Sequence, residues 1–292
     1  MFFCYNEYMK KSWIDNKTIV ITGASSGIGR ELARLFLENN NAKVIGVGRS
    51  EKKMLEFKST LGAFADNFEY HLFDVGEENG WKGFAKEIEK REVDVLINNA
   101  GILPPFASFD NLVKMKAQEN CEEFEKIMKT NFMSVVYGVR YLSPIIEKSK
   151  TPAIINVSSS AGLCALPGIS MYSASKSAVK NFTECLSLEK KYYVGLVCPG
   201  FTKTELFRGQ VRSTESKLID MISTSLNKMT KKIYKGINKK KKRMVFGLDA
   251  KSMDKFYRMF PKTGPVFFKK ILKGAKVELF DDVFDNNRRN KK

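Results

Sequence analysis

Short apolar runs alternate with helical segments along most of this 292-residue chain. The runs are continuous rather than alternating in polarity, which is typical of strands that are buried on both faces. Such strands, each followed by a helix, predict an α/β fold with a doubly wound parallel sheet of about seven strands and helices on both faces. The predicted strands are residues 17–22, 43–47, 68–73, 93–97, 153–157, 194–198 and, as a short seventh, 244–246.

Helical spacing marks the segments between and after these strands. We divide the chain into an N-terminal arm (1–16), one α/β domain (17–247) and a basic helical C-terminal extension (248–292). The predicted helices are residues 28–37, 54–61, 81–91, 124–148 and 172–189, with 250–260 and 266–276 in the extension.

The first predicted strand runs into a glycine-rich turn with the spacing Gly-x-x-x-Gly-x-Gly. Glycines let the backbone approach a pyrophosphate, and the following helix presents free N–H groups and its positive dipole end to that anion. An ordinary strand-to-helix turn is the alternative, but the position after the first strand favours nucleotide binding. The expected cofactor-binding residues of this turn are Gly23, Ser25, Ser26, Gly27, Ile28 and Gly29.

The end of the second strand indicates which nucleotide binds. An acidic residue there would bond the ribose 2′-hydroxyl of NAD, but the chain has Gly48-Arg49-Ser50. Arg49 offers a planar fork that suits a 2′-phosphate, and Ser50 and Lys53 are expected to assist. We therefore expect NADP(H) to be preferred over NAD(H); a solvated loop arginine is the alternative.

The third and fourth strands also end in residues that suit a cofactor. Asp74 and Val75 follow the third strand, where they can meet the amino group and the ring of an adenine. Asn99, Ala100 and Gly101 follow the fourth, where an amide can brace the backbone and small residues let the cofactor pass.

Tyr172 and Lys176 are four residues apart, so on a helix they share one face. A phenol has a reference pKa of about 10, and a neighbouring ammonium lowers it by favouring the phenolate. With a serine hydroxyl nearby, the pair forms a general acid for a carbonyl or a general base for an alcohol. Alone, the spacing fits an ordinary helix surface equally well, so the other motifs decide its meaning.

The motifs occur together in one order: Thr22–Gly29, Asn98–Gly101, Ser159, Tyr172-x-x-x-Lys176 and Pro199-Gly200. As a set, they resemble the short-chain dehydrogenase/reductase family over about residues 17–247. The resemblance implies a Rossmann fold and an NAD(P)-dependent oxidoreductase.

The resemblance also implies the residue roles. Tyr172 is the acid/base, and Lys176 lowers its pKa and binds the nicotinamide ribose. Ser159, thirteen residues before Tyr172, positions the substrate oxygen and is chosen over Ser158 and Ser160. Asn131 matches the helix asparagine that holds a water in the proton relay. The loop after the sixth strand completes the cofactor set: Pro199, Gly200, Thr202 and Thr204, the last bonding the carboxamide.

The segment between Ser159 and Tyr172 is mainly apolar. With Phe201, Leu206 and Phe207, residues 163–169 predict a pocket wall for a hydrophobic ketone, aldehyde or alcohol, steroid-like, lipid-derived or aromatic. The equal alternative is that these residues are loop core. Residues 205–222 are the expected lid, from which Arg208 and Arg212 can approach an acidic group.

The net charge of +18 belongs mainly to the last third of the chain. Residues 205–292 hold 24 of the 50 lysines and arginines but only 9 of the 32 acidic residues. Contact of the basic amphipathic extension with an anionic membrane surface is one interpretation. Packing on the enzyme core is the other, and we prefer it. Nucleic-acid binding is disfavoured because no recognition module is present.

Cysteine and histidine usage narrows the function further. Five scattered cysteines without C-x-x-C indicate reduced thiols in a cytoplasmic protein. His71 is the only histidine, which argues against a Ser-His-Asp triad and a metal site. We expect a homodimer through the helices at 124–148 and 172–189. The alternative function is a catalytically weak nucleotide sensor or membrane-surface binding protein on the same fold.

Overall fold

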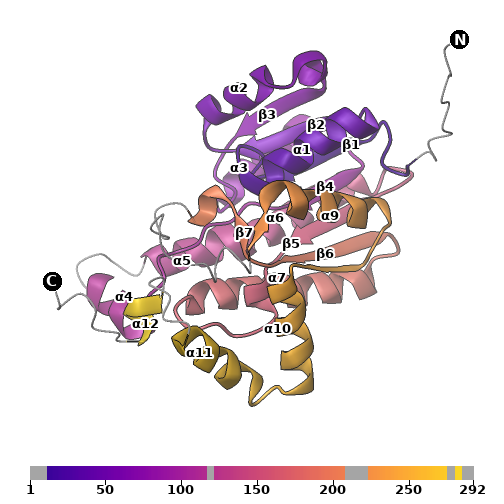
Figure 1. The fold of residues 1–292 in the computed structure, drawn as a ribbon. Helices are drawn as coiled ribbons and strands as arrows, with labels where there is room; N and C mark the ends of the chain where they lie inside the picture. The colour runs from indigo at the N-terminus through magenta and orange to yellow at the C-terminus, as the bar shows by residue number, and fades with distance from the viewer. Residues whose placement is uncertain (1–11, 117–121, 208–222, 275–279, 285–292) are drawn as a thin grey trace, which may run out of the picture.

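The computed structural model describes residues 12–116, 122–207, 223–274 and 280–284. Its centre is a parallel seven-stranded sheet with the order β3-β2-β1-β4-β5-β6-β9 (Figure 1). This confirms the doubly wound Rossmann fold, and it places the ligand site at the β1/β4 reversal. The strands are β1 (Thr18–Thr22), β2 (Lys43–Gly48), β3 (Phe68–Leu72), β4 (Val95–Asn98), β5 (Ala153–Val157), β6 (Tyr193–Pro199) and β9 (Arg243–Phe246).

Helices cover both faces of the sheet because successive strand side chains point to opposite sides. The helices are α1 (Gly27–Asn40), α2 (Glu51–Ser59), α3 (Glu78–Ile88), α6 (Ser134–Ile146), α7 (Ser170–Glu189) and α9 (Leu226–Asn238). Ile19 and Ile21 pack under α1, α2 and α9, whereas Val20 packs on the other face under α3, α6 and α7.

The helix predicted at 124–148 is not continuous. It consists of α5 (Glu122–Met128), a π-helical turn at Lys129–Met133, and α6, which ends at Ile146. A π turn accommodates an extra residue without changing the apolar pattern much, so helical spacing did not reveal it. The turn contains Asn131, and this matters for the site below.

Three helices were not predicted, α4 (Phe109–Lys116), α9 and α12 (Asp281–Phe284). The sequence signal for α9 was present: Met229, Ile233 and Ile237 are spaced by four and fully buried. Lysines at the remaining positions made this segment resemble the charged run that follows it. The short strands β7 (Thr202–Lys203) and β8 (Thr224–Ser225) pair beside it.

The C-terminal extension packs on the domain through its inner faces. It contains α10 (Leu248–Met259) and α11 (Gly264–Gly274), which lie below α7 in Figure 1, and α12 (Asp281–Phe284), which is drawn at the left. Met253 and Phe280 are buried in the apolar cluster that contains Tyr172, with Tyr257, Phe268 and Leu272 partly buried against it. The preferred interpretation, packing on the core, is confirmed for these faces. Among the described helices, none has the length and hydropathy that crossing a bilayer requires.

The N-terminal arm and the expected lid are only partly described. Residues 205–207 form a 3-10 turn, and the rest of the expected lid, with Arg208 and Arg212, lies outside the described residues. Ile14 is fully buried, and the Trp13 indole N–H donates to the Ile237 carbonyl oxygen at 3.1 Å.

Helix α2 offers a test of the packing. The fully buried Phe57 stacks edge-on against Phe68, with ring centres 4.9 Å apart. Phe57→Ala should lower the free energy of unfolding by about 3–5 kcal/mol because it removes a core ring and leaves a cavity. Leu55→Ala, on the exposed side of the same helix, should change it by less than about 0.5 kcal/mol. Urea unfolding measures both; equal losses would contradict the described orientation of α2.

Candidate active site

The glycine turn is held tightly against the loop that follows β4. Gly23 has φ +69°, in the left-handed region that favours glycine. A Cβ on Gly29 would collide with the Gly23 carbonyl oxygen and the Asn99 amide. The Thr22 hydroxyl accepts the backbone N–H groups of Asn99 and Ala100 at 2.9 and 3.0 Å, and the Asn99 amide donates to the Thr22 carbonyl at 2.9 Å. Asn99 therefore braces the backbone, as predicted.

Arg49 stands at the outer end of β2 beside an acid. Its guanidinium pairs with the Asp74 carboxylate at 3.1 Å, and both side chains are exposed. The other Asp74 oxygen accepts the Gly76 N–H at 2.9 Å. Ser50 caps α2 by accepting the Lys53 N–H. Arg49 and Asp74 thus neutralise one another, a pairing that the sequence did not reveal.

Lys53, on the first turn of α2, reaches across the nucleotide side of the molecule. Its ammonium pairs with Glu205 at 2.7 Å. The two residues are 152 positions apart in the sequence, so no local pattern connects them. This pair joins the start of α2 to the turn that opens the expected lid.

Asn131 lies fully buried in the π-helical turn, and its amide makes three hydrogen bonds. The amide N–H₂ donates to the Ile102 carbonyl and the Ser175 hydroxyl, both at 3.0 Å, and the amide oxygen accepts the Ile102 N–H at 2.7 Å. Ser175 donates in turn to the Tyr172 carbonyl at 2.8 Å. Asn131 and Ser175 therefore connect the loop after β4 to the helix of Tyr172. Sequence analysis missed Ser175, whose only signal was its place between Tyr172 and Lys176.

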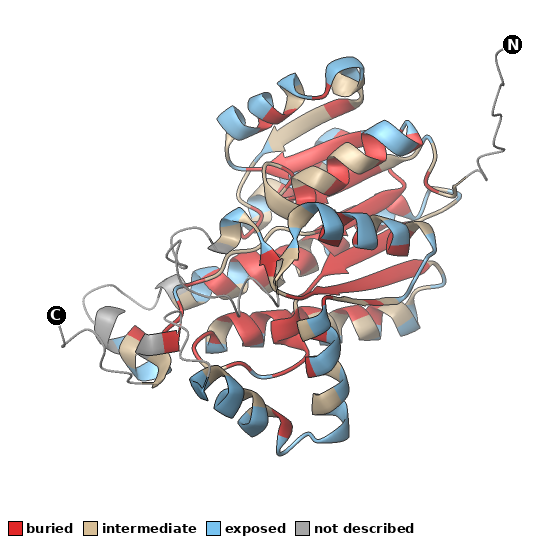
Figure 2. Ribbon diagram, in the orientation of Figure 1, coloured by how far each residue is buried: buried red, intermediate tan, exposed pale blue. Residues whose placement is uncertain are grey.

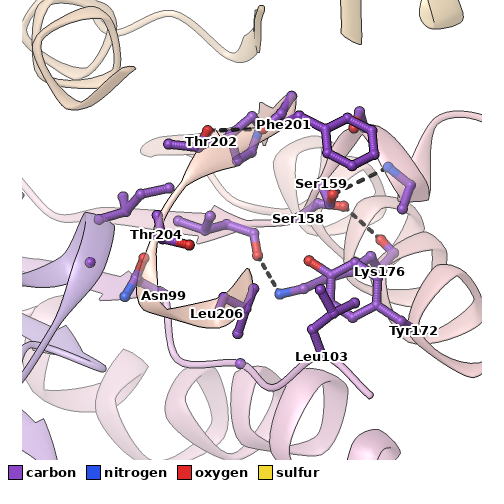
Figure 3. Close-up of a pocket in the computed structure, with 18 of the residues that line it drawn as sticks. Asn99, Leu103, Ser158, Ser159, Tyr172, Lys176, Phe201, Thr202, Thr204 and Leu206 are labelled. Carbon is purple, nitrogen blue, oxygen red and sulfur yellow. Dashed lines mark hydrogen bonds between the residues drawn. The ribbon is translucent and has the colours of Figure 1, made fainter. Parts of the chain in front are cut away.

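Tyr172 and Lys176 lie on one face of α7, as predicted, and both are buried (Figure 3). The Lys176 ammonium lies 5.9 Å from the centre of the Tyr172 ring and donates to the Val157 carbonyl oxygen at 3.1 Å. Burial lowers the pKa of Lys176 to about 8. The ammonium is therefore poised to exchange a proton near neutral pH.

The pKa of Tyr172 differs from the prediction. Burial raises it to about 12, and the hydrogen bond with Ser159 offsets only part of the rise. The prediction that Lys176 lowers the pKa of Tyr172 is therefore wrong for the protein alone. The physical reason is that the phenol packs among Phe106, Ile169 and other apolar side chains, which disfavour the phenolate. Sequence spacing shows a neighbouring charge but not this burial.

The three consecutive serines differ in their contacts. Ser158 donates to the Lys176 carbonyl at 2.7 Å, so its hydroxyl points into the base of α7. Ser159 caps the 3-10 turn Ser160–Gly162 by accepting the Ala161 N–H, and it shares a hydrogen bond with Tyr172. Ser160 is buried. The geometry is therefore consistent with the choice of Ser159.

One cavity brings most of the predicted site together, and Figure 3 shows Thr202 and Thr204 facing Ser159, Tyr172 and Lys176 across it. Ser25, Gly29, Arg49, Ser50, Asp74, Val75 and Asn131 do not line it. Gly29 lies behind the turn, Asn131 is in the core, and Arg49 and Asp74 are at the outer edge. The predicted residues that line it are Gly23, Ser26, Gly27, Ile28, Asn99, Ala100, Gly101, Ser159, Tyr172, Lys176, Pro199, Gly200, Thr202 and Thr204.

The remaining wall of the cavity is apolar. Of the predicted wall, Leu166, Ile169, Phe201 and Leu206 line it. Leu163 instead packs into the core with Leu196 and Cys198, as the alternative interpretation holds. Two wall residues were missed, Leu103 and Phe106, because they follow Gly101 in a stretch without regular periodicity.

The C-terminal extension supports this wall from behind. Phe280 packs edge-on against Phe106, with ring centres 5.4 Å apart. The Asp249 carboxylate accepts the Phe201 N–H at 2.7 Å and thereby ties the start of α10 to the loop after β6. Burial raises the pKa of Asp249.

Comparisons with known proteins agree with this geometry. The model of the short chain dehydrogenase family matches residues 17–215. The chain is 31% identical to 3beta-hydroxysteroid dehydrogenase 2 of Eggerthella lenta over 205 residues. The aligned region covers 68% of this chain and 76% of that protein. The chain is 32% identical to dehydrogenase/reductase SDR family member 7B of Bos taurus over 71% of this chain and 64% of that protein.

Solved structures show the same fold. The short-chain dehydrogenase from Sphingobium yanoikuyae in complex with NADPH superposes with a TM-score of 0.67 at 22% identity, covering 89% of this chain and 93% of that one. A short-chain dehydrogenase/reductase from Burkholderia phymatum in complex with NAD gives 0.66 at 24% identity, covering 79% and 89%.

The buried lysine predicts a pH-dependent stability difference. A Lys176 pKa of about 8, below its value of about 10.5 in the unfolded chain, means that the unfolded state binds more protons between these pH values. The wild type should therefore gain stability relative to Lys176→Met as the pH rises from about 7 to 9.5, by about 2 kcal/mol. Urea unfolding of both proteins at the two pH values measures this. A constant difference would show that Lys176 is not held in a charge-disfavouring site.

Proposed function

Because this chain belongs to the short-chain dehydrogenase/reductase family, and is thus an NAD(P)-dependent oxidoreductase, we propose that it interconverts a hydrophobic ketone or aldehyde and its alcohol with NADP(H). The observation that carries the proposal is the shared cavity. It places the nucleotide turn, an apolar wall and the group Ser159, Tyr172 and Lys176 around one space.

The turn fits a dinucleotide. Gly23 and Gly27 line the cavity with positive φ, so the backbone is bare of Cβ atoms where a pyrophosphate would rest. The N-terminus of α1 begins at Gly27 and points its N–H groups there. Thr202 and Thr204 line the opposite side, where a nicotinamide carboxamide would be held.

In the reducing direction, the residues act on the substrate oxygen. NADPH, when bound, supplies the hydride to the carbonyl carbon. Ser159 hydrogen-bonds the carbonyl oxygen and Tyr172 donates its phenolic proton to that oxygen. The raised pKa of Tyr172 keeps the phenol protonated until transfer. Lys176, with a pKa of about 8, stabilises the resulting phenolate and returns a proton to it.

The substrate class follows from the cavity wall. Among the described residues, Lys176 and Glu205 are the charged side chains that line it, and Lys176 is engaged with Val157. Leu103, Phe106, Leu166, Ile169, Phe201 and Leu206 suit an apolar body, aromatic or steroid-like. The name of the Eggerthella lenta relative includes a hydroxysteroid, which supports the same class.

The cofactor preference rests on Arg49. One solved neighbour binds NADPH and another NAD, so neighbours do not decide it. A 2′-phosphate at the end of β2 would exchange the Asp74 contact of Arg49 for a bidentate phosphate contact. Lys53, on the first turn of α2, adds a second cation nearby.

Two proposed partners are compatible with this function. A homodimer through α5–α6 and α7 remains a prediction. Contact of the extension with a lipid surface does not compete with turnover, because the inner faces of α10 and α11 pack toward the pocket and their outer faces point away from it.

Removing the phenol tests the catalytic role. Tyr172→Phe should lower kcat for ketone reduction by about 10²–10⁴-fold, because it removes the phenol that donates the proton to the substrate oxygen. Tyr193→Phe is the matched control, since this buried tyrosine bonds the Lys241 carbonyl away from the cavity and should keep kcat. NADPH absorbance follows both. Full activity of Tyr172→Phe would refute the proposed acid.

Removing the charge of the Arg49 guanidinium tests the cofactor preference. Arg49→Gln should weaken NADPH binding about ten- to a hundredfold, because it removes charge-assisted bonds to the phosphate. NADH binding should change little. The control is Lys52→Gln, which removes an exposed charge three residues further along the chain. It should change the binding of neither NADPH nor NADH. Fluorescence titration gives the dissociation constants, and equal losses for NADPH and NADH would exclude the phosphate contact.

A further inference from the structure

Helix α11 carries two apolar rows that lie about 100° apart around its axis. Phe268 and Leu272, four residues apart, pack inward on the cluster around Tyr172. Val266, Phe267 and Ile271 point outward, and 52%, 47% and 43% of their surfaces are exposed. Packing on the enzyme explains the inner side only. Figure 2 shows the outer side of α11 as exposed surface at the edge of the molecule.

The outward residues continue across the turn onto the end of α10. Met259 and Phe260 are 59% and 45% exposed. Phe256 joins the two helices, because its ring lies 5.0 Å from that of Phe260 and 4.8 Å from that of Phe267. Phe260 and Phe267 therefore form one supported surface, which continues one turn along α11 to Ile271. We call it the outer row: Phe260, Phe267 and Ile271.

Residues 248–274, which carry the outer row, have a positive net charge. Residues 248–274 contain seven lysines and arginines and two aspartates. Both aspartates are engaged inward: Asp254 with Arg243 through two bonds of 2.7 Å, and Asp249 with the Phe201 N–H.

The lysines, in contrast, face solvent. Lys262, Lys269, Lys270 and Lys273 are all exposed. In the part of the chain that the structure describes, no acidic side chain lies within 4.0 Å of these ammonium groups. On α11, Phe267 and Ile271 share one flank, and Lys269 and Lys273 share the other.

We propose that the outer row docks on the surface of an anionic lipid bilayer. Apolar side chains enter the boundary between headgroups and acyl chains, while the long lysines keep their ammonium groups at the phosphates. A second copy of this chain fits less well. A symmetric contact would set the same lysines against one another without an acid between them.

Docking would also bring the substrate pocket close to lipid, a consequence that rests on the proposed function. The inner side of the same helices covers Phe106, Leu166 and Ile169, which line the cavity. The extension would then lie between the bilayer and the apolar wall. A hydrophobic ketone dissolved in the membrane is the substrate source that this arrangement favours.

Vesicle co-sedimentation tests the docking surface. The full chain should pellet with vesicles of phosphatidylcholine and phosphatidylserine, and far less with phosphatidylcholine alone. The variant Lys269→Glu/Lys270→Glu/Lys273→Glu should bind the anionic vesicles at least about tenfold more weakly. Phe267→Ser/Ile271→Ser should also lose binding. The matched control is Lys239→Glu/Lys241→Glu/Lys242→Glu, in the exposed run before β9, which makes the same charge change and should keep most of the binding.

Several outcomes would overturn the proposal. Wild type that stays in the supernatant with anionic vesicles excludes docking, and equal losses in the two lysine variants would show diffuse attraction instead. A wild type that does not bind, together with a lower mass of Phe267→Ser/Ile271→Ser in light scattering, would assign the row to a contact between copies.

Activity without vesicles separates this proposal from the proposed function. All variants should reduce a water-soluble ketone like the wild type, since none of the changed residues lines the cavity. Vesicle binding without any turnover would refute the enzyme function alone. Turnover without vesicle binding would refute the docking alone.

Discussion

The site depends on how closely α7 approaches the turn that follows β5. A Cβ on Gly162 would lie 2.6 Å from the Lys176 carbonyl oxygen, so only glycine permits this distance. The Ser158 hydroxyl donates to the same carbonyl, and the Lys176 ammonium donates back to the Val157 carbonyl. These contacts fix the helix at the end of the strand. They set Tyr172 against Ser159 and bury it, and the burial in turn determines its pKa.

A second set of contacts fixes the nucleotide side of the same space. Thr22 and Asn99 lock the glycine turn to the loop after β4, and Asn131 locks that loop to α7 through Ile102 and Ser175. The order of the strands brings β1, β4 and β5 side by side, so both sets meet at one sheet edge. A nucleotide site and a proton donor therefore share a cavity because of topology rather than chain proximity.

The sequence was most informative where burial is uniform. The seven strands of the central sheet were predicted within two residues at each end, because a short, continuous apolar run between turn residues is typical of a strand that is buried on both faces. The π turn at Asn131 was not foreseen, since one extra residue hardly disturbs a helical pattern. The pairs Arg49–Asp74 and Lys53–Glu205 join distant segments and have no local signal. The sign of the Tyr172 pKa shift depended on burial that spacing does not encode.

The C-terminal extension shows why one pattern can support two interpretations. The apolar stripe of α11 suggested either packing on the core or contact with a membrane. Phe268 and Leu272 satisfy the first, whereas Phe267 and Ile271, next to them in sequence, remain exposed. Sequence periodicity could not separate the two rows, because consecutive residues on a helix lie only about 100° apart.

The central claim is that nucleotide and carbonyl meet in the cavity that Ser159, Tyr172 and Lys176 line. Its most direct test follows an isotope. The protein is incubated with NADPH that carries deuterium at the transferable C4 position, together with a panel of aromatic and steroid ketones, and the products are analysed by mass spectrometry. The expected product is an alcohol with one deuterium on the former carbonyl carbon. Consumption of no NADPH and formation of no labelled alcohol with any ketone of the panel would contradict it.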